Sequence, residues 1–139
     1  MATSRMEPDL VTDQRLLGVL AELRRREPIF HRRELVSSRE DFERETAEDY
    51  WEVGASGQRY SREFVWSVLS ERYASSATDE YETGAWTMSD EQVREVAPHA
   101  YLLTYTLRQG DRVTRRLTVW QGSAQTGWKI VYHQGTIVR

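Results

Sequence analysis

Two residues far apart in the chain carry side chains suited to proton transfer, Glu52 and His133. Alternate side chains of a strand point to opposite faces, so in the expected strand at 50–54 Glu52 shares a face with Tyr50 and Gly54. In the expected strand at 128–134, His133 shares a face with Lys129 and Val131, whereas Trp128, Ile130 and Tyr132 occupy the other. A carboxylate beside an imidazole orients the ring and favours its charged form, which suits a general acid or base. The alternative is that His133 hydrogen-bonds locally and that Glu52 reaches solvent near the end of its strand.

The composition excludes several other kinds of chemistry. The sequence has no cysteine and three histidines, which rules out a disulfide framework, a thiolate zinc site and a cysteine nucleophile. No P-loop, Rossmann glycine pattern, Ser-His-Asp signature or zinc motif is present. We therefore expect no metal and no cofactor.

The charge pattern argues against a nucleic acid or a membrane as partner. The formal net charge is −3, so no overall basic field attracts polyanions. Five arginines lie within 24–33, but Glu22, Glu27 and Glu34 dilute them, and the segment resembles a solvated helix end. No apolar run approaches the roughly 18–20 residues of a membrane span, and the first residues do not form a signal peptide. We expect a soluble cytoplasmic protein.

The 139 residues fit one domain, predicted over 10–139 after a flexible N-terminus at 1–9. Leu16, Leu17, Leu20 and Leu23 have the spacing of one face of a helix that ends before Pro28. Capping-box pairs that begin at Ser37 and Ser38 predict a second helix running to about Glu48. Ser61 is expected to cap a third helix, whose buried face holds Phe64, Val65, Val68 and Leu69. A polar loop is expected at 73–83.

The C-terminal half is expected to be an antiparallel meander. Strand patterns cover 100–107, 113–120 and 128–134, with a turn between each pair. The segment 85–96 fits either a helix opened by Ser89 and Gln92 or a long bent strand. Helices that cover one face of a single curved sheet make the fold class α+β.

Four stretches of the sequence resemble the nuclear transport factor 2-like superfamily, specifically its bacterial group known as domain of unknown function 4440. They are residues 27–31, 50–63 and 93–105, and Trp120 together with 128–136. The resemblance implies a cone, in which a curved, mostly antiparallel sheet wraps around the N-terminal helices and leaves a pocket at the open end. It favours the strand for 85–96, and it implies a homodimer formed through the convex face of the sheet.

The same resemblance implies positions for the candidate site. It makes the face of Val131 concave, so that His133 points into the pocket, and it makes the first and last strands neighbours, so that Glu52 approaches His133. Trp128, Ile130 and Tyr132 then lie on the convex face, where a two-fold partner covers them. The steroid isomerases of the superfamily need a carboxylate base that would fall near Gly54, and that constellation is absent. The candidate ligand-binding residues are Tyr50, Glu52, Val131, His133, Tyr101, Tyr105 and His31.

The sequence therefore predicts a small pocket protein that binds a small, partly apolar molecule. One alternative is an isomerase, dehydratase or hydrolase that uses His133 and Glu52 as tentative catalytic acid and base. Another is a module that binds a second protein through its sheet. Fold alone does not decide between them, because one fold supports many functions.

Overall fold

The computed structural model describes residues 6–32, 34–74 and 86–139, apart from the side chain of His31. Residues 1–5 of the predicted flexible N-terminus and most of the loop predicted at 73–83 lie outside these ranges. The elements in chain order are η2 (Gln14–Leu16), α1 (Leu17–Arg24), η3 (Ile29–His31), α2 (Arg39–Glu45), β1 (Thr46–Val53), β2 (Arg59–Ser61), α3 (Arg62–Ala74), β3 (Trp86–Ala97), β4 (Ala100–Gln109), β5 (Arg112–Ser123) and β6 (Gly127–Ile137).

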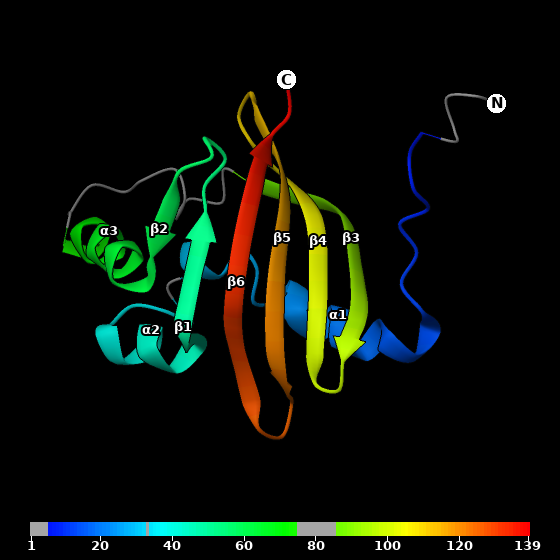
Figure 1. Cartoon of the computed structure of the whole chain (residues 1–139), viewed down its shortest axis with the longest axis horizontal. Coiled ribbons are helices and arrows are strands. Elements are labelled where there is room, and N and C mark those ends of the chain that lie inside the picture. The colour runs from blue at the N-terminus through cyan, green and yellow to red at the C-terminus, as the bar shows by residue number, and fades with distance from the viewer. Residues whose placement is uncertain (1–5, 33, 75–85) are drawn as a thin grey trace.

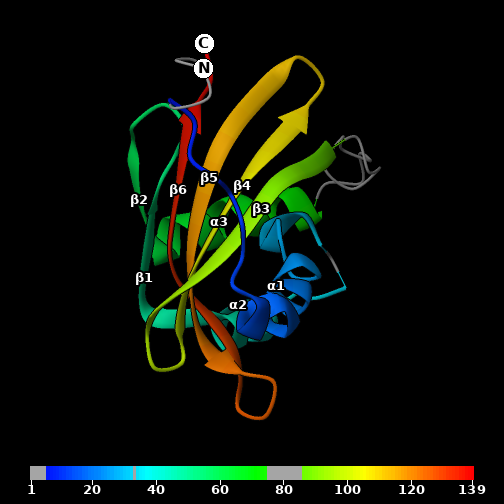
Figure 2. The same ribbon diagram turned by 90° about the vertical axis from the view of Figure 1, so that its right-hand side faces the viewer.

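The six strands form one curved sheet in the order β2-β1-β6-β5-β4-β3. All neighbouring strands are antiparallel except β1 and β6, which run parallel. The helices lie on one side of this sheet, which curves around them (Figures 1 and 2). The predicted α+β class and curved, mostly antiparallel sheet are confirmed.

Side-chain caps begin the helices, and those of α2 and α3 lie where the sequence predicts them. The Asp13 side chain accepts a hydrogen bond at the start of η2, Ser38 Oγ accepts from Asp41 N (3.1 Å), and Ser61 Oγ accepts from Phe64 N (3.1 Å). The second helix ends at Glu45, however, and β1 begins directly at Thr46, four residues before the predicted start at Tyr50. The cause is tertiary, because Thr46 pairs with Ile130 of β6.

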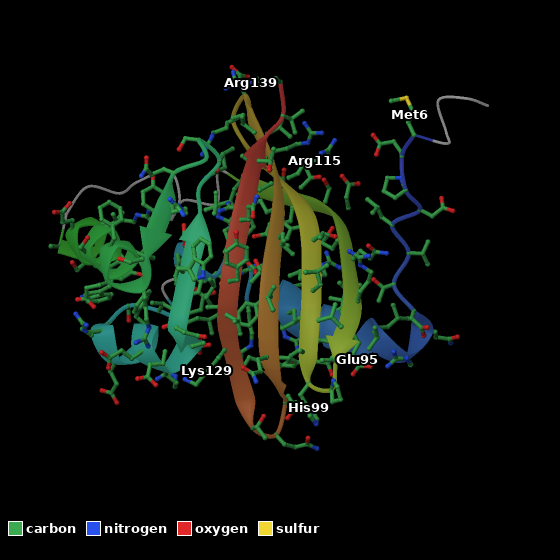
Figure 3. The ribbon with its side chains drawn as sticks, viewed as in Figure 1. Met6, Glu95, His99, Arg115, Lys129 and Arg139 are labelled. Carbon is green, nitrogen blue, oxygen red and sulfur yellow. The ribbon has the colours of Figure 1, made fainter. Side chains whose placement is uncertain are left out.

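The segment 86–97 is a strand, as the resemblance implied, and it pairs with β4. Its register shifts between Ser89 and Gln92, and Asp90 between them has a φ of 60°. This break interrupts the strand alternation and explains why the local pattern fitted two structures. The following turn holds His99, which is exposed at the end of the sheet opposite Arg115 (Figure 3).

The predicted faces of β6 are partly wrong. Val119 pairs with Tyr132 and Trp120 with Ile130, which leaves Val131 as an extra residue in β6. A bulge of this kind reverses the side-chain alternation beyond it. Trp128 and Ile130 are consequently buried on the concave side, not exposed on the convex side, and only Tyr132 of the three faces outward, with its ring 5.0 Å from that of Trp51.

Candidate functional site

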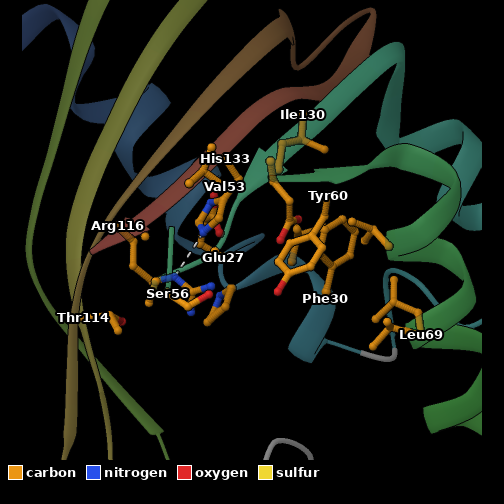
Figure 4. A pocket seen from close by; sticks show the side chains of 18 of the residues that line it. Glu27, Phe30, Val53, Ser56, Tyr60, Leu69, Thr114, Arg116, Ile130 and His133 are labelled. Carbon is orange, nitrogen blue, oxygen red and sulfur yellow. Dashed lines mark hydrogen bonds between the residues drawn. The ribbon is translucent and has the colours of Figure 1, made fainter. Parts of the chain in front are cut away.

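A cavity of about 540 Å³ opens between the concave face of the sheet, α3 and the segment around η3 (Figure 4). One wall is apolar and comes from Ile29, Phe30, Val65, Leu69 and Ile130. The opposite wall is polar and holds Glu52, Arg116 and His133. The two walls would contact different parts of a bound molecule.

The imidazole of His133 is held by two residues of β5. Thr118 pairs with His133 across the sheet, and Thr118 Oγ1 lies 2.8 Å from His133 Nδ1. Arg116 Nε donates to His133 Nε2 at 3.1 Å. A guanidinium can only donate, so Nε2 is the acceptor and the ring proton is on Nδ1, where it donates to Thr118. His133 is thus a neutral imidazole in one tautomer, oriented by β5.

Glu52 is the register partner of His133 on the adjacent parallel strand, and both line the cavity. Its carboxylate accepts a hydrogen bond from the Tyr50 hydroxyl. Burial raises the pKa of Glu52, and the nearby Glu27 acts in the same direction, while Tyr50 and Arg116 oppose them. The net effect is a raised pKa, which suits a general acid or base.

Glu27 is a further polar group of the cavity and was not recognised as one from the sequence. It is only 1% exposed. Its carboxylate accepts hydrogen bonds from Tyr105 Oη (2.9 Å) and Trp120 Nε1 (3.0 Å). The sequence contains a pattern that indicates its burial. Glu27 continues the helical spacing of Leu20 and Leu23, so it falls on the apolar face of that segment.

Known proteins resemble this chain in structure only. No family model matches the sequence, and no curated protein matches it. An NTF2-like protein from Cytophaga hutchinsonii superposes with a TM-score of 0.63 at 16% identity, covering 91% of this chain and 100% of that chain. A protein of unknown function of the DUF3225 family from Pectobacterium atrosepticum gives 0.61 at 16% identity, covering 96% and 98%. An NTF-2 like protein of unknown function from Silicibacter pomeroyi gives 0.58 at 19% identity, covering 92% and 100%.

The chain has the NTF2-like fold. This agrees with the resemblance drawn from the sequence, while the narrower group, domain of unknown function 4440, stays a prediction. At these identities the comparison describes the arrangement of the chain and not its chemistry.

Within this NTF2-like fold the remaining candidate residues have different surroundings. Tyr105 lines the cavity, and Tyr50 lies buried behind Glu52. Tyr101 is also buried, with its ring packed edge-on against Trp128 at 5.6 Å, away from the described cavity wall. Val131, the bulge residue, is likewise not part of that wall. The backbone of His31 belongs to η3, but its side chain lies outside the described part of the structure.

The arginines of the polar wall were not predicted from the sequence, in which the arginines are most densely clustered in the segment 24–33. Arg112 and Arg116 line the cavity together with Thr114, which lies between them on the same face of β5. Strand alternation in this segment could have placed all three on one face, but the choice of the concave face depends on the tertiary structure.

Residues 6–32, 34–74 and 86–139 contain neither a metal-binding cluster nor a membrane-spanning helix. No group of three or more histidine, aspartate or glutamate side chains in these ranges is arranged to hold a metal ion. No helix in the same ranges has the length and apolar character needed to cross a membrane.

Proposed function

We propose that the cavity binds a small, partly apolar molecule. The observation that carries this proposal is the division of the cavity into an apolar and a polar wall. Phe64 and Val68 of α3 support it, because both line the cavity although they are 49% and 39% exposed. A ligand with an apolar body would cover these side chains, and removing apolar surface from water favours binding.

Binding of N-phenyl-1-naphthylamine, an uncharged probe that fluoresces in apolar surroundings, tests this proposal. Val68→Trp should obstruct the cavity and weaken probe binding at least about fivefold, which corresponds to roughly 1 kcal/mol. Val96→Trp is the matched control, because Val96 is an exposed valine of β3 that does not line the cavity. The proposal fails if the protein does not bind the probe, or if both variants bind it as the natural protein does.

A second candidate function is proton transfer within the cavity, in an enzyme of the isomerase, dehydratase or hydrolase kind. The specific observation is Glu52, a cavity-lining carboxylate with a raised pKa beside the oriented, neutral His133. Burial makes such a carboxylate a stronger base than one in water. Acid–base catalysis of this type contributes typically about 10²–10⁴ in rate.

The ring opening of 5-nitrobenzisoxazole, which needs only a base in an apolar site, tests this candidate. Glu52→Gln should lower the rate at least about tenfold. Glu48→Gln, which neutralises an exposed carboxylate of the same strand, should leave the rate unchanged. Equal rates for the natural protein and Glu52→Gln would exclude Glu52 as the base.

We also propose that two copies of the chain associate through the convex face. Trp51 is 43% exposed there and packs its ring against Tyr132, so an apolar aromatic pair faces outward. Aromatic residues are enriched in the cores of protein interfaces. Association with a different protein, the third function considered for this sequence, would use the same face and leave the purified chain monomeric.

A further inference from the structure

We propose that the ligand of this cavity is an organic acid, whose anionic group binds between Arg112 and Arg116 on β5 and whose apolar part lies against α3 and η3. This inference rests on the proposed binding function and specifies its ligand class. It follows from three neighbouring side chains of one strand face, Arg112, Thr114 and Arg116, which we call the β5 cluster.

Arg116 is positioned as an anion-binding group. Its Nε donates to His133, and this contact directs the guanidinium along the cavity wall. Among the described residues, its two terminal amino groups have no hydrogen-bond acceptor and no carboxylate within ion-pair distance. A guanidinium presents its donors as a planar fork, which matches the two oxygens of a carboxylate.

Thr114 adds a second donor that has no partner. It is 3% exposed, and its Oγ1 is buried without a hydrogen bond in the described structure. Buried hydroxyls nearly always have a partner, so an unpaired one in a cavity wall indicates a site that a bound group completes. Figure 4 shows Thr114 beside Arg116 on the same wall.

Arg112 completes the β5 cluster at the exposed end of the strand. It lines the cavity, and no ion pair or side-chain hydrogen bond holds it among the residues that the structure describes. By strand geometry, it lies on the same face as Thr114 and Arg116. A charged group that enters the cavity from solvent would meet this side chain.

The charges of the cavity favour an anion over a cation. Among the described residues, Arg112 and Arg116 of β5 line it together with the two carboxylates Glu27 and Glu52. Both carboxylates already accept hydrogen bonds from protein hydroxyl or indole groups. The β5 cluster has unused donors, so it is the part of the wall that can bind a further charged group.

The apolar wall determines the rest of the ligand. Phe30, Val65 and Leu69 line the side that faces the polar wall, and the charged side chain there, Arg72, donates to the Phe30 carbonyl at 3.2 Å. A molecule with one anionic end and an apolar body satisfies both walls, whereas a small inorganic anion would leave the apolar wall uncovered. The inference is therefore an amphipathic organic acid.

The test compares 4-phenylbutyrate with 4-phenylbutyramide, which differ only in the charge and donors of one end. Each displaces N-phenyl-1-naphthylamine in a competition assay, and calorimetry measures each directly. We expect the acid to bind at least about tenfold more tightly than the amide, as a charge-assisted bidentate contact predicts. Arg116→Gln and Arg112→Gln should each reduce this preference at least about threefold, and Thr114→Val should reduce it in the same direction.

Arg115→Gln is the matched control. Arg115 belongs to the same strand but to its other face, where Nη1 donates to Thr106 Oγ1 at 2.6 Å. Its removal changes the net charge as Arg116→Gln does, so the preference for the acid should persist in this variant. A loss of preference in Arg115→Gln would mean that only the overall charge matters, and would overturn the inference.

The outcomes separate this inference from the proposed function. If the natural protein binds the uncharged probe but does not prefer the acid, the inference is wrong and the binding function stands. If the natural protein does not bind the probe, the proposed binding function fails in that test. Calorimetry with 4-phenylbutyrate and 4-phenylbutyramide then tests the inference directly, without the probe. If inorganic phosphate competes as strongly as phenylbutyrate, the inference of an organic acid is overturned, and the β5 cluster is a general anion site.

Discussion

Replacing Glu27 by glutamine should destabilise the protein although the two side chains have nearly the same shape. The Glu27 carboxylate accepts from Tyr105 Oη at 2.9 Å and from Trp120 Nε1 at 3.0 Å. An amide has one acceptor oxygen, so its nitrogen would face one of these donors. Trp120 is fully buried, so its Nε1 cannot donate to water instead, whereas Tyr105 lines the cavity and its hydroxyl can still find a partner there.

The size of the effect follows from this count of donors. Leaving one buried donor unsatisfied costs about 1–3 kcal/mol, and a hydrogen bond to a charged group contributes about 1.5–3 kcal/mol. Removing the buried charge has an opposite, favourable effect, because the carboxylate no longer has to leave water. We expect the donor loss to exceed it and Glu27→Gln to lower the free energy of unfolding by about 2 kcal/mol. Glu27→Ala leaves both donors unpaired and should lower it by about 4 kcal/mol.

Urea unfolding, followed by tryptophan fluorescence and by circular dichroism, measures both variants. The midpoint should fall while the dependence on urea concentration stays constant, as expected for a change in stability alone. Glu48→Gln, on the exposed part of β1, is the control and should change stability by less than about 0.5 kcal/mol. If Glu27→Gln is as stable as the natural protein or more stable, the reasoning is refuted, since burial of the charge would then outweigh both hydrogen bonds.

Three further predictions concern other parts of the chain. The pKa of Glu52 in the folded protein lies above its ordinary value of 4.5, so its contribution to stability is present below that value and is lost as the pH rises through the folded pKa. Urea unfolding should therefore show that Glu52→Gln gains stability relative to the natural protein when the pH is raised from 4 to 7.5. An equal difference in stability at both pH values would contradict this. Gly122 has a φ of 127°, and a Cβ there would lie 2.0 Å from the carbonyl oxygen of Gly127. Gly122→Ala should therefore lower the free energy of unfolding by at least about 2 kcal/mol, which thermal unfolding would show as a lower midpoint. A midpoint equal to that of the natural protein would disprove the close approach. Light scattering at micromolar concentration should give the mass of a dimer that Trp51→Ser converts to a monomer, and a monomeric natural protein would count against the proposed interface.

Much of the local structure could be predicted from the sequence, because it depends on residues close together in the chain. The capping side chains of Ser38 and Ser61 satisfy backbone groups a few residues away, so their spacing alone predicts where α2 and α3 begin. The strands β4 to β6 follow from apolar alternation between turn residues. The adjacent placement of Glu52 and His133 came from the resemblance to a known fold, and these residues are indeed register partners.

The tertiary structure decided which side chains meet, for reasons that no local pattern contains. The bulge at Val131 exists only in the pairing of β6 with β5, and it turns both Ile130 and His133 toward the cavity. The hydrogen bonds that set the tautomer of His133 come from Thr118 and Arg116, which the turn between β5 and β6 and about half of each strand separate from it along the chain. Glu27 became a buried acceptor because Tyr105 and Trp120, both distant in sequence, supply its donors. Registers, bulges and buried polar contacts depend on which strands lie side by side. This is why the sequence and its resemblance predicted the elements and the placement of Glu52 and His133, but not that of Glu27 and Arg116.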